Sequence, residues 1–301
     1  MDYLTLSPGL PASSRLGFGC GSVMGRVSRA ESLRAIAVAL DRGITHFDVA
    51  RLYGYGEAEG LLGEALKGRR DKLVVASKFG LAPPRAAGAL RRLKPLAQGV
   101  VAAMPGLRPL LRSALGAGTR AADRFSAAAA QASLDGSLAA LATDYLDILF
   151  LHDCEPEDLT DELAAFLDAQ VMAGKIRAYG AATSIEAVAA LHRRHGDAML
   201  YQFANSAFAR NADTLPRGKR RYIAHSPFLG ADRLRAPNRH RLMLGWALAQ
   251  DNVAVVLCSM LDEAHLLANL DTVANLDTVA NLDSVDRFAF GEVDVAALAA
   301  G

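Results

Sequence analysis

A chain of 301 residues is long enough to bury the core of one large α/β barrel or of two smaller domains. Hydrophobic residues make up 51% of it and the formal net charge is +1, so no basic surplus favours nucleic acid or a membrane surface as a partner. The N-terminus lacks the pattern of a signal peptide, and no apolar run reaches the roughly eighteen residues of a membrane span. We therefore expect a cytoplasmic protein that binds neither nucleic acid nor membrane.

The cysteines exclude two further classes. Cys20, Cys154 and Cys258 are odd in number, far apart in the sequence, and form no CxxC pair. This spacing argues against a disulfide framework and against a zinc site, and no metal is expected.

Apolar segments typical of strands alternate with helical patterns along most of the chain. The first strand is expected at 15–20, and the helix after it begins with a capping box of Ser28 and Glu31 and ends at Gly43. The residues of this helix that we expect to face the core are Leu33, Ile36, Ala37 and Leu40. Further strands are expected at 45–50, 72–79, 145–153, 175–183, 198–205, 221–227 and 252–259. Helices are expected at 57–67, 125–142, 163–174, 184–195, about 238–250 and from 261 onward.

The expected strands are too apolar for a sheet with one face exposed to solvent. Eight such strands, mostly followed by helices, favour an α/β fold of the (β/α)8 TIM barrel type over a doubly wound sheet. We expect a single barrel domain over 1–301, although the segment 206–220 leaves little room for a full helix.

Two segments depart from the barrel pattern. A basic stretch rich in alanine, proline and glycine, about 81–124, is too long for a simple loop and predicts an insertion with short helices of its own. The second segment, 268–285, consists of three near-identical hexapeptides, ANLDTV, ANLDTV and ANLDSV. Replication slippage that extends or frays the last helix is the simpler interpretation, and self-association through the repeated leucines and valines is the alternative.

Catalytic groups of such a barrel gather where strands end. Asp48, Lys78 and His152 lie at the ends of the second, third and fourth expected strands, and Tyr53 follows in the loop after Asp48. A lysine ammonium lowers the pKa of a nearby tyrosine, an aspartate keeps that lysine charged, and a histidine polarises a substrate oxygen. Taken singly, these residues would be read as a structural ion pair, a loop anchor and a core histidine. Together they favour catalysis at a carbonyl group.

The same segments resemble the motifs of the aldo-keto reductases. GITHFDVARLYGYGEAEGLLGEAL, VVASKFG, SLAALATDYLDILFLHD, GKIRAYGAAT and YQFANS occur in that family's order, and the resemblance extends from about residue 15 to 270. It implies an oxidoreductase that transfers a hydride between a nicotinamide cofactor and an aldehyde or ketone, or the corresponding alcohol. By this resemblance Asp48, Tyr53, Lys78 and His152 are the catalytic tetrad and Tyr53 is the proton donor, whereas Tyr55 falls on a variable position.

The resemblance also implies a cofactor site, in which this sequence departs from the usual pattern. Gln202 is retained as a partner of the nicotinamide carboxamide, but Ala182 and Thr183 replace a serine–asparagine pair. The aromatic residue that stacks on the nicotinamide corresponds to His225, and the usual cation at the adenosine 2′-phosphate is missing. The cofactor-binding residues predicted in this way are Thr183, Gln202, His225, Ser226, Ser259 and His265.

These departures concern the cofactor site and leave the tetrad intact. NADP(H) is the expected cofactor, NAD(H) stays open, and the partner is a small-molecule carbonyl or alcohol. The alternative is a reductase-derived protein that does not use NAD(P), either a ligand-binding or regulatory protein or a lyase-type enzyme acting with the same tetrad.

Overall fold

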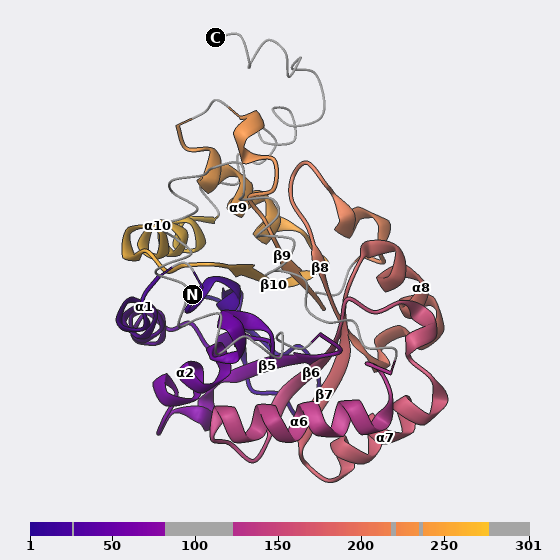
Figure 1. Cartoon of the computed structure of the whole chain (residues 1–301). Helices are drawn as coiled ribbons and strands as arrows, with labels where there is room; N and C mark the ends of the chain where they lie inside the picture. The colour runs from indigo at the N-terminus through magenta and orange to yellow at the C-terminus, as the bar shows by residue number, and fades with distance from the viewer. Residues whose placement is uncertain (26, 82–122, 218–220, 235–236, 277–301) are drawn as a thin grey trace, which may run out of the picture.

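The computed structural model describes residues 1–25, 27–81, 123–217, 221–234 and 237–276. Eight parallel strands form a closed barrel in the order β10-β3-β4-β5-β6-β7-β8-β9 (Figure 1). They are β3 (Leu16–Gly19), β4 (His46–Asp48), β5 (Val74–Phe79), β6 (Leu146–His152), β7 (Ile176–Ala182), β8 (Leu200–Ala204), β9 (Tyr222–His225) and β10 (Val253–Cys258). The predicted (β/α)8 barrel is confirmed.

Helices surround this barrel in Figure 1. They are α1 (Arg29–Asp41), α2 (Ala58–Ala65), α6 (Ala127–Leu141), α7 (Asp161–Met172), α8 (Ile185–His195), α9 (Arg239–Ala249) and α10 (Glu263–Ala274). Between β8 and β9 the described residues contain only a short 3-10 helix, η7 (Asn211–Thr214), in agreement with the little room predicted there.

The predicted capping box of α1 is confirmed, and its predicted core-facing residues are confirmed in part, because Ile36 is buried and Leu33 and Leu40 pack against the core whereas Ala37 does not. The Ser28 hydroxyl accepts a hydrogen bond from the backbone of Glu31, whose carboxylate accepts one from the backbone of Ser28. The buried residues of α1 are Ser32, Ala35, Ile36 and Ala39. Ala37 is exposed and both Leu33 and Leu40 are only half-buried. Because α1 contacts both α2 and α10, its apolar residues extend beyond the face that meets the barrel, and the periodicity alone misplaces the centre of that face.

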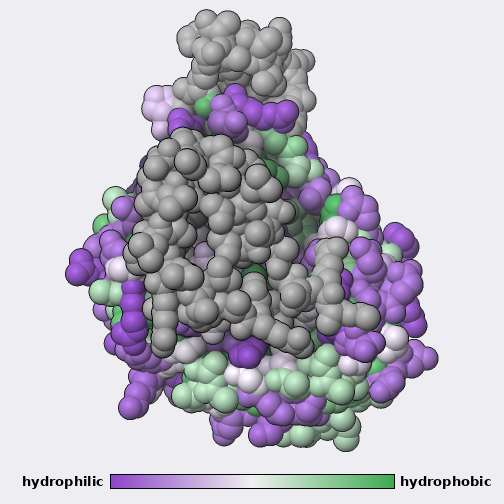
Figure 2. Space-filling model, viewed as in Figure 1, coloured by the Kyte–Doolittle hydropathy of each residue, from purple (hydrophilic) through white to green (hydrophobic). Residues whose placement is uncertain are grey.

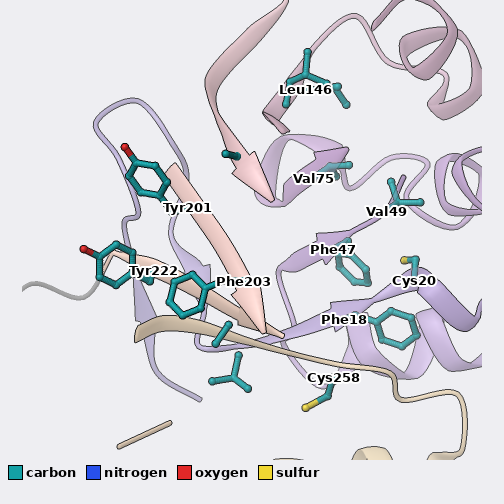
Figure 3. Packing of buried hydrophobic residues seen from close by; sticks show 14 of the residues in the cluster. Phe18, Cys20, Phe47, Val49, Val75, Leu146, Tyr201, Phe203, Tyr222 and Cys258 are labelled. Carbon is teal, nitrogen blue, oxygen red and sulfur yellow. The ribbon is translucent and has the colours of Figure 1, made fainter. Parts of the chain in front are cut away.

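Side chains of the strands alternate between two hydrophobic cores. The inner core fills the barrel and includes Val74, Ile148, Phe150 and Val255. The outer core lies between strands and helices, where the rings of Phe18 and Phe47 lie 5.8 Å apart (Figure 3). The inner set of positions ends in polar residues at the carboxyl ends of the strands, and that end of the barrel therefore holds the candidate site.

A hairpin that the sequence did not predict closes the opposite end of the barrel. Strands β1 (Tyr3–Leu4) and β2 (Ser13–Ser14) pair antiparallel, and Leu6 and Leu10 between them pack into the inner core. Ser14 fixes the hairpin to the residue before β4, because its hydroxyl and its backbone N–H both bond to Thr45.

The described surface is mixed in character. In Figure 2 hydrophilic and hydrophobic residues alternate on the coloured part of the face, and paler green residues gather near the lower edge, where Figure 1 draws the alanine-rich α6. Among the described residues, no helix is long and apolar enough to cross a membrane.

Parts of two predicted segments lie outside the described residues. These are 82–122 of the insertion and 277–285 of the hexapeptide repeat. The first repeat copy, 268–273, forms the second half of α10. Self-association through the repeat stays a prediction.

His46 is a buried histidine at the start of β4, inside the barrel and at the end opposite the candidate site. It is fully buried, its Nδ1 lies 3.0 Å from the hydroxyl of Ser13, and its ring fills space that the missing side chain of Gly17 leaves open. Burial lowers the pKa of His46 to about 4, because a charged imidazole would lose its hydration there. His46 is therefore neutral at physiological pH.

We predict that His46 makes the fold sensitive to acid. The unfolded chain binds a proton at this residue near pH 6.5 and the folded chain only near pH 4, so stability falls as the pH drops through that window. A difference of this size corresponds to about 3 kcal/mol. Urea unfolding at neutral pH and at about pH 5 should show a smaller loss of stability for His46→Gln than for the wild type. The exposed His265 serves as the control, and a His265→Gln variant that reduced the loss as much would contradict the assignment.

Candidate active site

Polar side chains converge at the end of the barrel where the strands finish. Asp48, Lys78 and His152 occupy the last inward positions of β4, β5 and β6, and Gln202 is an inward residue near the end of β8. They line a cavity of about 560 Å³. The other predicted site residues that line this cavity are Tyr53, His225, Ser226 and Ser259. The structure thus brings the four residues of the predicted tetrad together.

Asp48 and Lys78 form a buried ion pair at the base of this cavity. The Lys78 Nζ donates to Asp48 Oδ1 at 2.5 Å and to the carbonyl oxygen of Val49 at 3.1 Å. Asp48 is only 4% exposed and Lys78 only 2%. Burial lowers the pKa of Lys78, but the charges of Asp48 and Tyr53 and the hydrogen bond to Asp48 outweigh it, so that the net pKa is raised. Lys78 is therefore a fixed positive charge.

Gln202 occupies the other oxygen of Asp48. Its Nε2 donates to Asp48 Oδ2 at 2.9 Å, and a carboxylate can only accept, so the orientation of the amide is determined by chemistry. The remaining oxygen, Oε1, is buried and has no hydrogen-bond partner among the described residues. A buried acceptor without a donor costs free energy unless a ligand supplies one.

Tyr53 enters the cavity from the turn between β4 and α2. It begins the 3-10 helix η2 (Tyr53–Gly56), in which Gly54 and Tyr55 have the left-handed φ values 58° and 60°. At Gly54 a Cβ would lie 2.8 Å from the carbonyl oxygen of Val23, so the turn requires glycine there. Tyr55 does not line the cavity, and the two tyrosines of this segment are therefore distinguished by position.

The ring of Tyr53 lies between the lysine and the histidine. Lys78 Nζ is 5.2 Å from the ring centroid, and the His152 ring meets it edge-on at 6.1 Å. Burial raises the pKa of the Tyr53 hydroxyl and the charge of Lys78 opposes that rise, with a net pKa above the ordinary value. The lowered pKa that the neighbouring lysine predicts is therefore wrong, because burial outweighs the charge of Lys78. At neutral pH the hydroxyl is protonated and is able to donate.

His152 is neutral under the same conditions. Burial and the charge of Lys78 lower its pKa to about 4. A neutral imidazole donates a hydrogen bond from one nitrogen only, so it polarises an oxygen in the cavity without placing a second positive charge beside Lys78.

The wall opposite the tetrad contains His225 and Ser226. His225 Nδ1 lies 2.9 Å from the Ser226 hydroxyl, and Ser226 has a left-handed φ of 57°. Burial lowers the pKa of His225, so its ring is uncharged. An uncharged aromatic ring in this wall offers a flat surface for stacking.

Thr183 is placed differently from the other predicted residues. Its hydroxyl donates to the carbonyl oxygen of Cys154 at 2.6 Å, and the residue is outside the cavity lining. Its neighbour Ala182 lines the cavity instead, at the last inward position of β7.

A second cavity of about 450 Å³ adjoins the first and shares Phe228 and Ser259 with it. Its lining contains the predicted His265 and also His240 and Arg241, which are not among the site residues predicted from the sequence. Arg241 pairs with Asp271 at 3.0 Å. The sequence does contain a signal for His240 and Arg241. Each helix of a β/α barrel begins at the end of the barrel where the preceding strand finishes, so the basic residues of NRHR at the start of α9 lie at the end that holds the site.

Comparisons with known proteins agree with this architecture. Aldo-keto reductase YhdN of Bacillus subtilis (strain 168) is 30% identical over 205 residues, which cover 64% of this chain and 52% of the relative. A 6-dehydroglucose reductase of Agrobacterium fabrum (strain C58) is 29% identical over 148 residues, or 48% of this chain and 41% of the relative. The chain thus spans about half of the length of these relatives. The holo form of an aldo-keto reductase from Bacillus halodurans has the same fold, with a TM-score of 0.65 over 94% of this chain and 96% of that chain at 20% identity.

A model of the aldo/keto reductase family matches residues 15–213. The match extends from the start of the barrel to η7, and it includes all four tetrad positions and Gln202. The chain belongs to the aldo/keto reductase family.

Proposed function

We propose that the chain is an NAD(P)H-dependent oxidoreductase that interconverts a small aldehyde or ketone and its alcohol. The observation that carries the proposal is the convergence of Asp48, Tyr53, Lys78 and His152 on one cavity, with Tyr53 protonated and His152 neutral. Reduction of a carbonyl group by hydride needs a proton for the carbonyl oxygen, which a protonated tyrosine is able to donate, and a neutral imidazole is able to hold that oxygen by a hydrogen bond.

Each residue has a distinct part in this reaction. Tyr53 donates its hydroxyl proton to the carbonyl oxygen, and His152 holds that oxygen by a hydrogen bond. The charge of Lys78 stabilises the phenolate that Tyr53 becomes, and Asp48 holds Lys78 in place. In the direction of alcohol oxidation the same groups work in reverse, with Tyr53 as the proton acceptor.

The cavity residues fit a nicotinamide cofactor. When bound, the reduced nicotinamide supplies the hydride to the carbonyl carbon. Gln202 Oε1 is a buried acceptor that the amino group of a carboxamide would satisfy, and the neutral ring of His225 is suited to stacking. Ser226 and Ser259 add hydroxyl groups to the same wall. Thr183 contributes less to this site than the family pattern implies, because its hydroxyl is already bound to Cys154.

The second cavity supports NADP(H) over NAD(H). Its lining includes His240, Arg241 and His265, and Arg241 is paired with Asp271 at 3.0 Å while its side chain stays 42% exposed. A phosphate monoester binds a guanidinium by charge-assisted hydrogen bonds. Arg241 therefore supplies the cation that is missing from the usual position in the sequence. The reductase proposal for a carbonyl substrate is also in keeping with the naming of a relative as a 6-dehydroglucose reductase.

Replacing Tyr53 by phenylalanine tests the proton donor. We expect Tyr53→Phe to lower kcat for the reduction of small aldehydes by at least about 100-fold, because general acid catalysis is lost. The Kd for NADPH, measured by nicotinamide fluorescence, should change less than about twofold, because the hydroxyl does not hold the cofactor. Tyr55→Phe is the matched control two residues away and should keep nearly all activity. Wild-type rates in the Tyr53→Phe variant would refute the assignment.

Replacing Arg241 by methionine tests the nucleotide preference. Arg241→Met should raise the Kd for NADPH by about tenfold, as expected for one charge-assisted hydrogen bond at a partly exposed site, and leave the Kd for NADH almost unchanged. Fluorescence titration with the two nucleotides measures both values. An equal effect on NADPH and NADH would show that Arg241 does not contact the 2′-phosphate.

A further inference from the structure

A second buried carboxylate lies on the outer side of the barrel wall, close to the tetrad. Glu59 on α2 is 1% exposed, and both of its oxygens are bound. Oε2 accepts from Arg51 Nη1 at 2.9 Å, and Oε1 accepts from the Ser77 hydroxyl at 2.6 Å. A carboxylate buried to this degree is stable only while these donors stay in place.

The two partners of Glu59 flank catalytic residues in the sequence. Ser77 precedes Lys78 on β5, and the alternation of the strand sends Ser77 outward and Lys78 inward. Arg51 lies two residues before Tyr53, in the segment that leaves β4. Glu59 therefore ties the Tyr53 segment to the strand that carries Lys78.

The position of Tyr53 depends on such a contact because the segment around it contains little regular secondary structure. Its backbone N–H bonds to the carbonyl oxygen of Ala50, and the following residues are left-handed. The centroid of its ring lies 5.2 Å from Lys78 Nζ and 6.1 Å from the centroid of the His152 ring, distances that a small shift of the segment would change.

We propose that Arg51, Glu59 and Ser77 form a clamp that positions Tyr53 against Lys78 for proton transfer, an inference that rests on the proposed function. The clamp residues do not line the cavity, so they act on the reaction through Tyr53 and are positioning residues. Loss of Arg51 leaves Glu59 buried with one donor fewer and removes the link between Glu59 and the segment that leads to Tyr53. The Tyr53 segment is then free to shift.

Gly136 on α6 gives the clamp the room it needs. A Cβ at this position would lie 2.8 Å from Arg51 Nη2 and 3.0 Å from Cζ, so the guanidinium would have to move away. Alanine is favoured over glycine inside a helix, and Gly136→Ala therefore disturbs Arg51 without weakening α6. This substitution changes the position of Arg51 while it keeps the charge of Arg51 beside Glu59.

The experiment compares four variants of the full chain with the wild type. For each we would measure kcat and KM with a reactive aldehyde, the Kd for NADPH, and the melting temperature. Arg51→Met should lower kcat by about 10- to 100-fold, the size expected from a misplaced reacting group, and change the Kd for NADPH by less than about twofold. Arg51→Lys should recover part of kcat because it keeps the charge, and Gly136→Ala should lower kcat with a smaller fall in melting temperature than Arg51→Met, because the charge beside Glu59 is retained.

Arg70→Met is the matched control. Arg70 binds the buried Asp147 at 2.6 Å near the start of β6, at the opposite end of the barrel, and does not touch the site. Its loss should lower the melting temperature at least as much as Arg51→Met does and leave kcat within about twofold of the wild type.

The outcomes separate this inference from the proposed function. Equal kcat values in Arg51→Met and Arg70→Met would show that the clamp only stabilises the fold, and would overturn the inference alone. An unchanged kcat in Gly136→Ala with a displaced Arg51 would do the same. A wild-type chain that reduces no aldehyde or ketone with either nucleotide would overturn the proposed function and the role of the clamp with it.

Discussion

The buried ion pair between Asp48 and Lys78 is the interaction on which the rest of the site depends. Removing two charges from water costs several kcal/mol for each ion, and the cost is offset only when the pair is close and its remaining groups are bound. Here Lys78 also donates to the carbonyl oxygen of Val49, and Gln202 donates to the second oxygen of Asp48. The barrel makes this possible because β4, β5 and β8 each deliver one of these side chains to the same interior end.

That pair also sets the protonation of its neighbours. Burial raises the pKa of Tyr53, and the lysine charge limits the rise, so the hydroxyl is kept as a donor whose phenolate still has a cation beside it. The same charge, added to burial, keeps His152 neutral with a pKa of about 4. The charge of Lys78 thus limits the rise in the pKa of Tyr53 and lowers the pKa of His152. The proposed clamp at Glu59 would hold the segment that carries Tyr53.

The convergence of the candidate tetrad could be predicted from the sequence because one simple rule places three of its four residues. Residues at the ends of β/α barrel strands face the site, and Asp48, Lys78 and His152 lie at such ends. Other features depend on tertiary contacts that no local pattern contains. The N-terminal hairpin is too short to show a strand pattern, the buried face of α1 is set by its neighbours, and Arg241 reaches the site only because α9 begins at the active end. The net pKa of Tyr53 required the degree of burial, which the sequence does not contain.

A double-mutant cycle on Asp48 and Lys78 is the most direct test of whether this ion pair organises the site. Asp48→Asn, Lys78→Met and the double variant would be compared with the wild type for kcat in the reduction of an aldehyde by NADPH. If Asp48 acts by holding Lys78 charged and in place, the double variant should lose no more activity than Lys78→Met alone, because residues that act as a unit are not additive. Losses that multiply, or a Lys78→Met variant with wild-type kcat, would contradict the claim that this pair organises the site.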